Sequence, residues 1–268
     1  MASFKNLMDV LKILPKTNCR KCNEKTCMAF AAAVFKGDKP LSLCPDVAPE
    51  ILDQYAEPVK NANNQEQDWE KALAALKAQL TAIDFTEAAR RTGGTYDGRK
   101  LTVRIMGKEF SVDHDGVLYS DIHVNRWITM PILSYIINCK GTPVSGKWVS
   151  MRELPSGIDW YHFFSKQCEQ RMKKLADTYT DLFEDLVQIF DGKPTDHHYQ
   201  SDIAVTLRPL PLVPLLVTYL RPEEGMDSSL SLLFDATAEE NLGIQGLYTL
   251  GTGIVTMFEK LARRHGVS

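Results

Sequence analysis

Four cysteines between Pro15 and Pro45 place the strongest constraint on how this chain can fold. They are separated by two, four and sixteen residues, and a proline follows the last. Three thiols within nine residues can converge on one centre, and the fourth must return from beyond a helix. Four thiolates arranged in this way suit either a [4Fe–4S] cluster or a structural zinc ion. The predicted ligands are Cys19, Cys22, Cys27 and Cys44.

The spacing of the cysteines distinguishes between these two metal centres. Zinc sites commonly divide their ligands between two Cys-x-x-Cys pairs, which gives a two-plus-two pattern. The pattern here is three plus one, and the last cysteine precedes proline, as it often does in cluster ferredoxins. The spacing therefore favours a [4Fe–4S] cluster, with zinc as the alternative. Disulfides are the weakest interpretation, because the sequence shows no secretion signal.

The residues around the cysteines form an extended motif. It reads Leu14-Pro15-x-Thr17-Asn18-Cys19-x-x-Cys22, then Thr26-Cys27-Met28-Ala29-Phe30-Ala31, then Cys44-Pro45. This stretch resembles the small iron–sulfur domain of the large subunit of corrinoid iron–sulfur proteins, which belong to the acetyl-CoA pathway. Similar domains occur in the B subunit of membrane-bound ferredoxin:NAD oxidoreductases. The resemblance implies low-potential, one-electron transfer in an anaerobe, linked to corrinoid-dependent one-carbon metabolism.

The loop departs from that family at three positions. Members commonly have glycine where this chain has Lys16, Arg20 and Asn23. Glycine eases the close approach of backbone to a cluster. Asn23 can take a left-handed conformation, whereas Lys16 and Arg20 do so only at a cost. The departure bears on the loop geometry and the cluster potential rather than on the ligands.

Composition and charge are those of an ordinary globular protein. The chain has 268 residues, of which 44% are hydrophobic and 24% charged, enough for one large domain or two smaller ones. A formal net charge of −3 argues against nucleic acid as a partner. No apolar run is long enough to cross a bilayer. We therefore expect no membrane span and a cytoplasmic location.

A polar segment from Glu57 to Asp68 is the predicted linker, because it lacks hydrophobic periodicity. It divides the chain into a cluster domain, residues 1–57, and a larger domain, residues 69–268. In the first we expect helices over residues 3–14, 26–35 and 49–55, with Gly37 ending the second. Cys27 then lies in the first turn of its helix, where free N–H groups face the cluster.

The larger region is predicted to be α+β with an antiparallel sheet, because its helices and strands do not alternate regularly. Helices are expected over residues 69–83, 84–91, 124–139, 159–190 and 241–264. Strands are expected over residues 100–106, 109–112, 117–119, 203–207, 215–220 and 230–234, with a proline-rich turn between 207 and 215. No catalytic signature is present, and whether the protein is an enzyme stays open.

A second motif runs through this larger region. It comprises Gly146-x-Trp148-Val149-Ser150-x-Arg152-Glu153-Leu154-Pro155, Tyr161-His162-Phe163-Phe164, Leu210-Pro211-x-Val213-Pro214-Leu215-Leu216, Leu233-Phe234-Asp235-Ala236-Thr237-Ala238 and Asn241-Leu242. These residues resemble an uncharacterised bacterial family that occurs alone or fused to the same cluster domain. The resemblance implies no established activity.

The most varied chemistry of the larger region lies in and after this motif. Trp148, Arg152, Tyr161 and His162 are the predicted cofactor contacts, since aromatic rings, a cation and an imidazole suit a flat anionic macrocycle. A corrinoid (cobalamin) carrier with the cluster as redox accessory is therefore the alternative to an electron-transfer protein. A packed core explains the same residues equally well, and for His162 it is the favoured interpretation.

Other polar residues have simpler interpretations. His123 belongs to Asp121-x-His123, which resembles the start of a corrinoid Asp-x-His-x-x-Gly motif, but Arg126 replaces the glycine. His197 and His198 are expected to be solvated. Cys139 and Cys168 are expected to be small buried residues rather than a second metal site.

The cysteine loop is rich in basic residues. They are Lys16, Arg20, Lys21 and Lys25, with Glu24 as the single acid among them. They are either a solvated rim or a docking surface for an acidic redox partner. The resemblance suggests a corrinoid protein or methyltransferase as that partner.

Overall fold

The computed structural model describes residues 7–36, 39–54, 62–120, 126–179, 181–195 and 201–264. Two compact units form the chain, Met1–Ala72 and Leu73–Ser268. The first is helical, and the second contains antiparallel sheets, so the predicted α+β class is confirmed. No helix within the described ranges combines the length and the apolar character that a membrane span needs.

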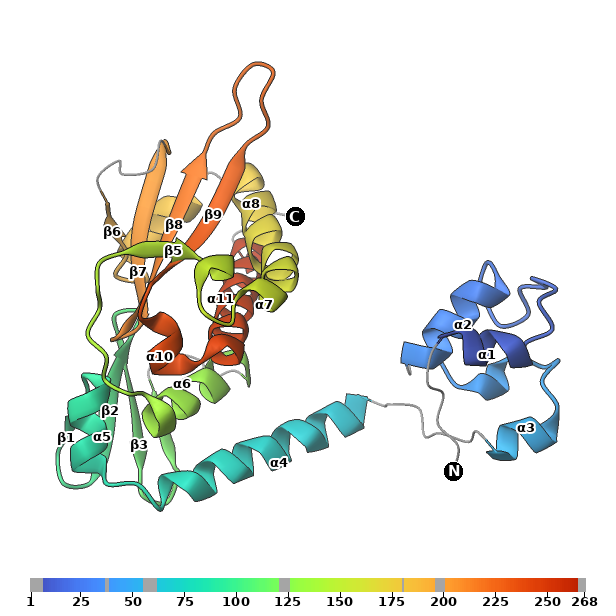
Figure 1. Ribbon diagram of the computed structural model, residues 1–268, viewed down its shortest axis with the longest axis horizontal. Coiled ribbons are helices and arrows are strands. Elements are labelled where there is room, and N and C mark those ends of the chain that lie inside the picture. The colour runs from blue at the N-terminus through green and yellow to red at the C-terminus, as the bar shows by residue number, and fades with distance from the viewer. Residues whose placement is uncertain are drawn as a thin grey trace. The chain divides into compact units, whose positions relative to one another are not determined.

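The first unit contains α1 (Leu7–Ile13), α2 (Cys27–Lys36) and α3 (Pro49–Gln54), with a 3₁₀ turn at Leu41–Leu43 (Figure 1). Thr26 caps α2, since its hydroxyl accepts a hydrogen bond from the N–H of Ala29 at 3.1 Å. The three predicted helices are confirmed at these positions. Residues 3–6 of the first helix, and Gly37 as a cap, lie outside the described residues.

α4 (Ala62–Leu80) begins before Trp69, where the sequence predicted its start. The later part of the predicted linker is therefore helical, and residues 55–61 lie outside the described ranges. The two compact units divide at Ala72, inside this helix. A division into independent domains at 57–68 stays a prediction.

The second unit opens with α5 (Phe85–Thr92). Asp84 caps its start by accepting from the N–H groups of Thr86 and Glu87, and Gly93 ends it with a φ of 68°. A four-stranded antiparallel sheet follows, in the order β1-β2-β3-β4. Its strands are β1 (Thr95–Tyr96), β2 (Lys100–Ile105), β3 (Lys108–Asp113) and β4 (Leu118–Ser120).

Helices then precede, interrupt and follow the strands of a second sheet. α6 (Arg126–Asn138) carries Pro131 inside it, and a loop leads on to β5 (Trp148–Ser150). The predicted helical stretch over 159–190 is confirmed as α7 (Ile158–Phe164), a π-helical turn (Ser165–Glu169), α8 (Gln170–Thr178) and α9 (Leu182–Gln188). The C-terminal stretch is α10 (Ala238–Leu242) and α11 (Ile244–Arg264), divided at Gly243.

The second sheet is antiparallel with the strand order β5-β9-β8-β7-β6. Its remaining strands are β6 (Lys193–Pro194), β7 (Ile203–Leu210), β8 (Val213–Leu220) and β9 (Ser229–Asp235). The sequence predicted a proline-rich turn between a strand that ends at residue 207 and one that begins at residue 215. This prediction was wrong, because only Pro211 and Leu212 separate β7 from β8. Pro209 is tolerated because the register shifts between Leu207 and Leu210.

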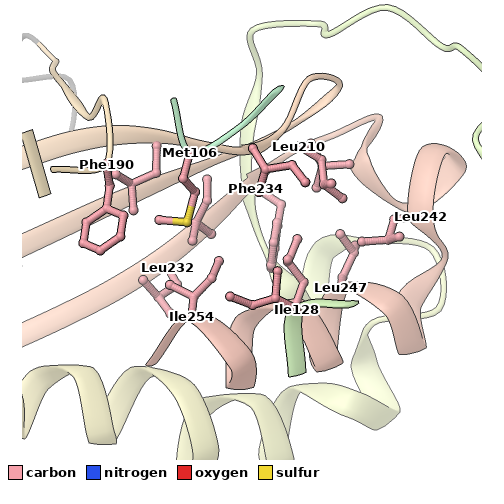
Figure 2. Packing of buried hydrophobic residues seen from close by; sticks show 14 of the residues in the cluster. Met106, Ile128, Phe190, Leu210, Leu232, Phe234, Leu242, Leu247 and Ile254 are labelled. Atoms are coloured by element: carbon pink, nitrogen blue, oxygen red, sulfur yellow. The ribbon is translucent and has the colours of Figure 1, made fainter. Parts of the chain in front are cut away.

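The core of the second unit lies between one face of this sheet and α11. Leu232 and Phe234 of β9 point toward Leu247 and Ile254 of α11 (Figure 2). Successive residues of a strand point to opposite faces, so Thr206 and Arg208 of β7 lie on the other face. That second face carries the hollow described below.

Candidate metal centre

The backbone of the cysteine loop is left-handed at several non-glycine residues. The φ values are 59° at Lys16, 50° at Asn18, 64° at Arg20 and 59° at Asn23. Three of these are the positions where the resembling family has glycine, so the loop keeps that geometry with bulkier residues. Alternation of left-handed residues can turn neighbouring N–H groups into one concavity, a form of backbone common at anion and iron–sulfur sites.

Asn18 links this loop to α2 through both its backbone and its side chain. Its N–H donates to Sγ of Cys27 at 3.4 Å, and its Oδ1 accepts from the N–H of Cys27 at 2.7 Å. The pair fixes Cys27 as the first residue of α2 and directs a donor at its sulfur. Such a donor stabilises negative charge on the sulfur.

The four predicted ligands differ in burial. Cys22, Cys27 and Cys44 belong to the core of the first unit, and Cys19 is exposed. The thiol of Cys19 lies 3.8 Å from Oδ2 of Asp46. Burial raises the pKa of the Cys44 thiol and outweighs the hydrogen bond from the backbone N–H of Asp46, which lowers it.

The donor set suits a cluster. Within the described ranges, no three side chains of His, Cys, Asp or Glu are arranged to hold a single metal ion. Each cysteine of a [4Fe–4S] cluster binds a different iron, so a cluster does not require that arrangement. Four thiols, with left-handed backbone at Lys16, Asn18, Arg20 and Asn23 beside them in sequence, fit such a group, and ligation by these residues stays a prediction.

The basic residues of the loop divide into paired and unpaired groups. Lys21 forms an ion pair with Asp46 at 3.2 Å, and Glu24 pairs with Lys39 at 2.7 Å. The remaining three have no ion-pair partner in the described part of the chain and are exposed; these are Lys16, Arg20 and Lys25.

The predicted cofactor contacts of the larger region do not all come together. The guanidinium carbon of Arg152 lies 5.8 Å from the ring centre of Tyr161. His162 is exposed on α7, with its ring 5.9 Å from that of Phe163, so the favoured interpretation of a core histidine was wrong. Trp148 lines a hollow on the second sheet, and the other three residues do not.

Sequence reasoning missed the role of Asp235. It is fully buried and accepts hydrogen bonds from the N–H groups of Ser145, Gly146 and Thr237 at 3.0, 2.7 and 3.0 Å. The hydroxyls of Ser145 and Thr237 donate to it as well. Burial raises the pKa of Asp235, but these hydrogen bonds outweigh burial and leave it below its ordinary value. Its position in the Leu233–Ala238 motif was the available signal.

Asn241, another residue of the motif, holds the same loop at its other end. Its Nδ2 donates to the carbonyls of Thr142 and Leu212, and its Oδ1 accepts from the N–H of Thr142. Asp235 and Asn241 therefore fix the backbone between α6 and β5. Both are structural in this respect, and neither is exposed.

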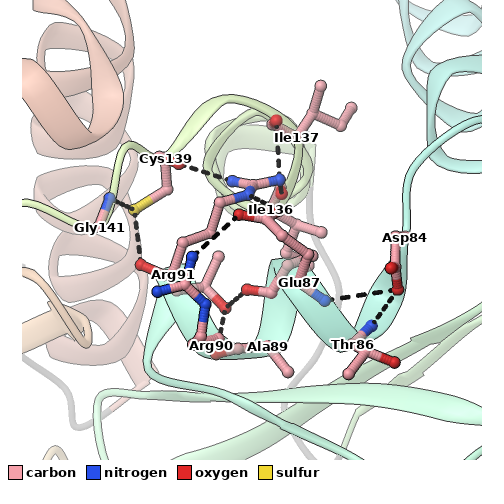
Figure 3. Close-up of polar contacts among 12 residues, drawn as sticks. Asp84, Thr86, Glu87, Ala89, Arg90, Arg91, Ile136, Ile137, Cys139 and Gly141 are labelled. Carbon is pink, nitrogen blue, oxygen red and sulfur yellow. Dashed lines mark hydrogen bonds and ion pairs between the residues drawn. The ribbon is translucent and has the colours of Figure 1, made fainter.

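Arg91 and Cys139 complete this polar network (Figure 3). Arg91 donates to the last carbonyls of α6, those of Ile136 and Ile137, and to that of Cys139. The thiol of Cys139 donates to the carbonyl of Arg91 at 3.3 Å. Cys168 is buried as well, and burial raises its pKa to about 12. The prediction that both cysteines are buried is confirmed, whereas His123, His197 and His198 lie outside the described residues.

Comparison with known proteins identifies both regions. Residues 14–45 match the family described as "Putative Fe-S cluster", and residues 84–257 match the "Domain of unknown function (DUF3786)". No solved structure matches the chain.

The curated relatives each match only part of the chain. The acetyl-CoA decarbonylase/synthase complex subunit gamma of Methanothermobacter thermautotrophicus is 51% identical over 41 residues, 15% of this chain and 9% of its own. The corrinoid/iron-sulfur protein large subunit of Moorella thermoacetica is 43% identical over 54 residues, 19% of this chain and 12% of its own. The gamma subunit of Methanopyrus kandleri is 39% identical over 124 residues, 40% of this chain and 27% of its own.

These matches cover only a small part of the relatives, whereas the 84–257 match covers well over half of this chain. The first region is an Fe–S cluster domain like the one in the corrinoid/iron-sulfur protein large subunit. The chain as a whole belongs to the DUF3786 family, and it carries this Fe–S domain in front of the family domain.

Proposed function

We propose that Cys19, Cys22, Cys27 and Cys44 hold a [4Fe–4S] cluster and that the protein carries single electrons at low potential in anaerobic one-carbon metabolism. The observation that carries the proposal is the left-handed backbone of the cysteine loop, which suits an anionic group. The names of the relatives, a corrinoid/iron-sulfur protein and acetyl-CoA decarbonylase/synthase subunits, support the metabolic setting.

The residues around the thiols have separate tasks in this proposal. The chemistry that the cluster supplies when bound is reversible one-electron exchange. The N–H of Asn18, together with the positive end of the α2 dipole, favours the more negative, reduced state. Burial of Cys22, Cys27 and Cys44 opposes added charge, and the exposed Cys19 marks the side that a partner can approach.

The test is electron paramagnetic resonance of the full chain, purified anaerobically and reduced with dithionite. We expect the signal of a reduced [4Fe–4S]⁺ centre, which disappears when a one-electron acceptor dye is added. Cys44→Ser should abolish or alter the signal, whereas Cys168→Ser, in the second unit, should leave it unchanged. A wild-type chain that carries iron but cannot be reduced would remove the electron-transfer role.

The partner proposed for this exchange is an acidic protein. Lys16, Arg20 and Lys25 are exposed and unpaired among the described residues, so they can steer such a partner toward Cys19. With a small acidic ferredoxin as the probe, Lys16→Ala/Arg20→Ala/Lys25→Ala should slow electron exchange at low salt and lose most of its salt dependence. Lys12→Ala is the control, since Lys12 pairs with Asp9 on α1. Equal rates in the two variants would remove this docking surface.

A corrinoid carrier is the second proposed function. The observation that favours it is the position of the Arg152 guanidinium over the ring of Tyr161, whose neighbour in sequence, His162, is exposed. Hydroxocobalamin is the probe, and the absorption spectrum of the full chain reports its binding. We expect Arg152→Ala and His162→Ala to weaken binding about tenfold, while Arg221→Ala has no effect. If hydroxocobalamin does not bind, the corrinoid belongs to a separate partner, a corrinoid protein or a methyltransferase.

A further inference from the structure

The face of the second sheet that points away from α11 carries a hollow of about 330 Å³. One wall is the loop before β5 with Trp148, and the other is formed by β6, β7 and the residues next to them. The lining residues are Val144, Gly146, Trp148, Asp191, Lys193, Thr195, Thr206, Arg208 and Pro214. The volume lies at the lower end of the range for small-molecule sites.

Strand register brings the polar lining residues to one face. Lys193 of β6 is paired with Thr206 of β7, and Arg208 lies two residues further along β7. Residues two apart on a strand share a face, so Lys193, Thr206 and Arg208 all point into the hollow. The hydroxyl of Thr195 lies 2.7 Å from that of Thr206.

The charges of the hollow favour an anion. Neither Lys193 nor Arg208 has an ion-pair partner in the part of the chain that the structure describes, and Asp191 is the single carboxylate of the lining. Arginine offers a planar fork of donors that matches the oxygens of a phosphate, and lysine adds a second positive charge. Lys193 and Arg208 carry two positive charges and Asp191 one negative charge, so the net charge of the lining is positive.

The opposite wall is flat and fixed. Trp148 is partly buried and lines the hollow together with the buried Pro214. The loop at Gly146, where φ is 77°, is held by the buried carboxylate of Asp235. A wall fixed before a ligand arrives reduces the entropy lost on binding.

We propose that this hollow binds a small aromatic phosphate, of the chemical class of nucleoside monophosphates and flavin mononucleotide. Lys193 and Arg208 hold the phosphate, and the ring stacks on Trp148. The hydroxyls of Thr195 and Thr206 and the carboxylate of Asp191 contact the polar groups between them. All of its lining residues belong to the second unit, so the site does not depend on a cluster.

The test is isothermal titration calorimetry of the anaerobically purified full chain with two probes, adenosine monophosphate and flavin mononucleotide. At least one should bind with a dissociation constant of roughly 1–100 μM. Arg208→Ala and Lys193→Ala should each weaken that binding about tenfold or more. Lys147→Ala is the matched control, because Lys147 is exposed beside Trp148 but does not line the hollow.

Two further variants separate the contributions of the ring and of the cluster. Trp148→Phe should retain most of the affinity and Trp148→Ala should lose it, and far-ultraviolet circular dichroism checks that both fold. Cys44→Ser should bind the probe as the wild type does. The proposal is overturned if neither probe binds at about 1 mM, or if Arg208→Ala and Lys193→Ala bind as tightly as Lys147→Ala. Inorganic phosphate that competes as well as the intact probe would overturn the role of Trp148.

Discussion

The two compact units stabilise their folds by different means. The first has a small core that includes cysteines, whereas the second buries a large apolar core between its sheets and helices. The core of the first unit consists of Val10, Leu14, Cys22, Cys27, Phe30, Ala31, Leu41, Cys44 and Val47. Domains with so little apolar burial usually need a metal or another cross-link to fold. We therefore expect the folding of the first unit, but not that of the second, to depend on the group that its cysteines bind.

The polar residues of the two units also have different roles. In the first, Asn18 directs its N–H at a cysteine sulfur. In the second, the buried Asp235 and Asn241 bind backbone groups of one loop. A motif residue can therefore have a purely structural role. For this reason the motif of the larger region does not by itself indicate catalysis.

The largest expected effect is that of metal removal. Chelation of the metal under anaerobic conditions should unfold the first unit and leave the second folded, because metal binding and folding are coupled in small metal domains. Hydrogen exchange with mass spectrometry measures this, with loss of protection expected in α1 and α2 and none in α11. If α1 and α2 keep their protection from hydrogen exchange after complete metal loss, the expected difference between the two units is contradicted.

Limited proteolysis tests whether the two regions are independent. We expect the first cut within Glu57–Asp68, because polar segments without hydrophobic periodicity are preferred sites of proteolysis. Mass spectrometry of the fragments should identify an N-terminal piece that retains the cysteines. A first cut elsewhere, with 57–68 protected, would mean that the two regions fold as one.

Asp235→Asn tests whether the hydrogen bonds of a buried carboxylate stabilise the second unit. The amide replaces an accepting oxygen with a donor that faces other donors, so the free energy of unfolding should fall by roughly 2–4 kcal/mol. Urea denaturation of the second unit measures the loss. Asp227→Asn is the control: Asp227 is exposed, and the change should cost less than about 0.5 kcal/mol.

The pH dependence of the same variant follows from the lowered pKa of Asp235. Its folded pKa lies below the unfolded value of about 3.9. Its contribution to stability is therefore present above that unfolded value and is lost as pH falls through the folded pKa. The stability gap between wild type and Asp235→Asn should narrow in acid, and a gap that widens would contradict this role.

The smallest expected effect concerns the strained loop. Left-handed geometry costs lysine and arginine about 1–2 kcal/mol, so Lys16→Gly and Arg20→Gly should each stabilise the metal-bound first unit by about 0.5–1 kcal/mol. Asn23→Gly should gain less, because asparagine tolerates this conformation. Thermal unfolding of the full chain distinguishes these variants. Destabilisation by both glycines would mean that the loop takes another conformation.

Local signals in the sequence predicted much of this fold. The helix expected over residues 84–91 is present as α5, which Asp84 and Gly93 bound because caps act on neighbouring backbone groups. Local reasoning failed where distant contacts decide. Pro209 and Pro214 suggested a turn, but a register shift and a place near the start of β8 let the strands continue.

The two candidate sites also differ in whether their residues lie close together in the sequence. The cysteine motif lies in one short stretch, so its four thiols could be proposed as ligands from their spacing, and their ligation stays a prediction. The hollow around Trp148 draws on β5, β6, β7 and β8, and only the strand register places Lys193 and Arg208 opposite that ring. His162 shows the reverse error, because aromatic neighbours in sequence suggested burial although the residue lies on the exposed side of α7.

Metal and sulfide analysis of the anaerobically purified wild-type chain tests the central claim most directly. If the four cysteines of the first unit hold a [4Fe–4S] cluster, each chain should contain about four irons and about four acid-labile sulfides. Stoichiometric zinc without acid-labile sulfide would contradict the claim.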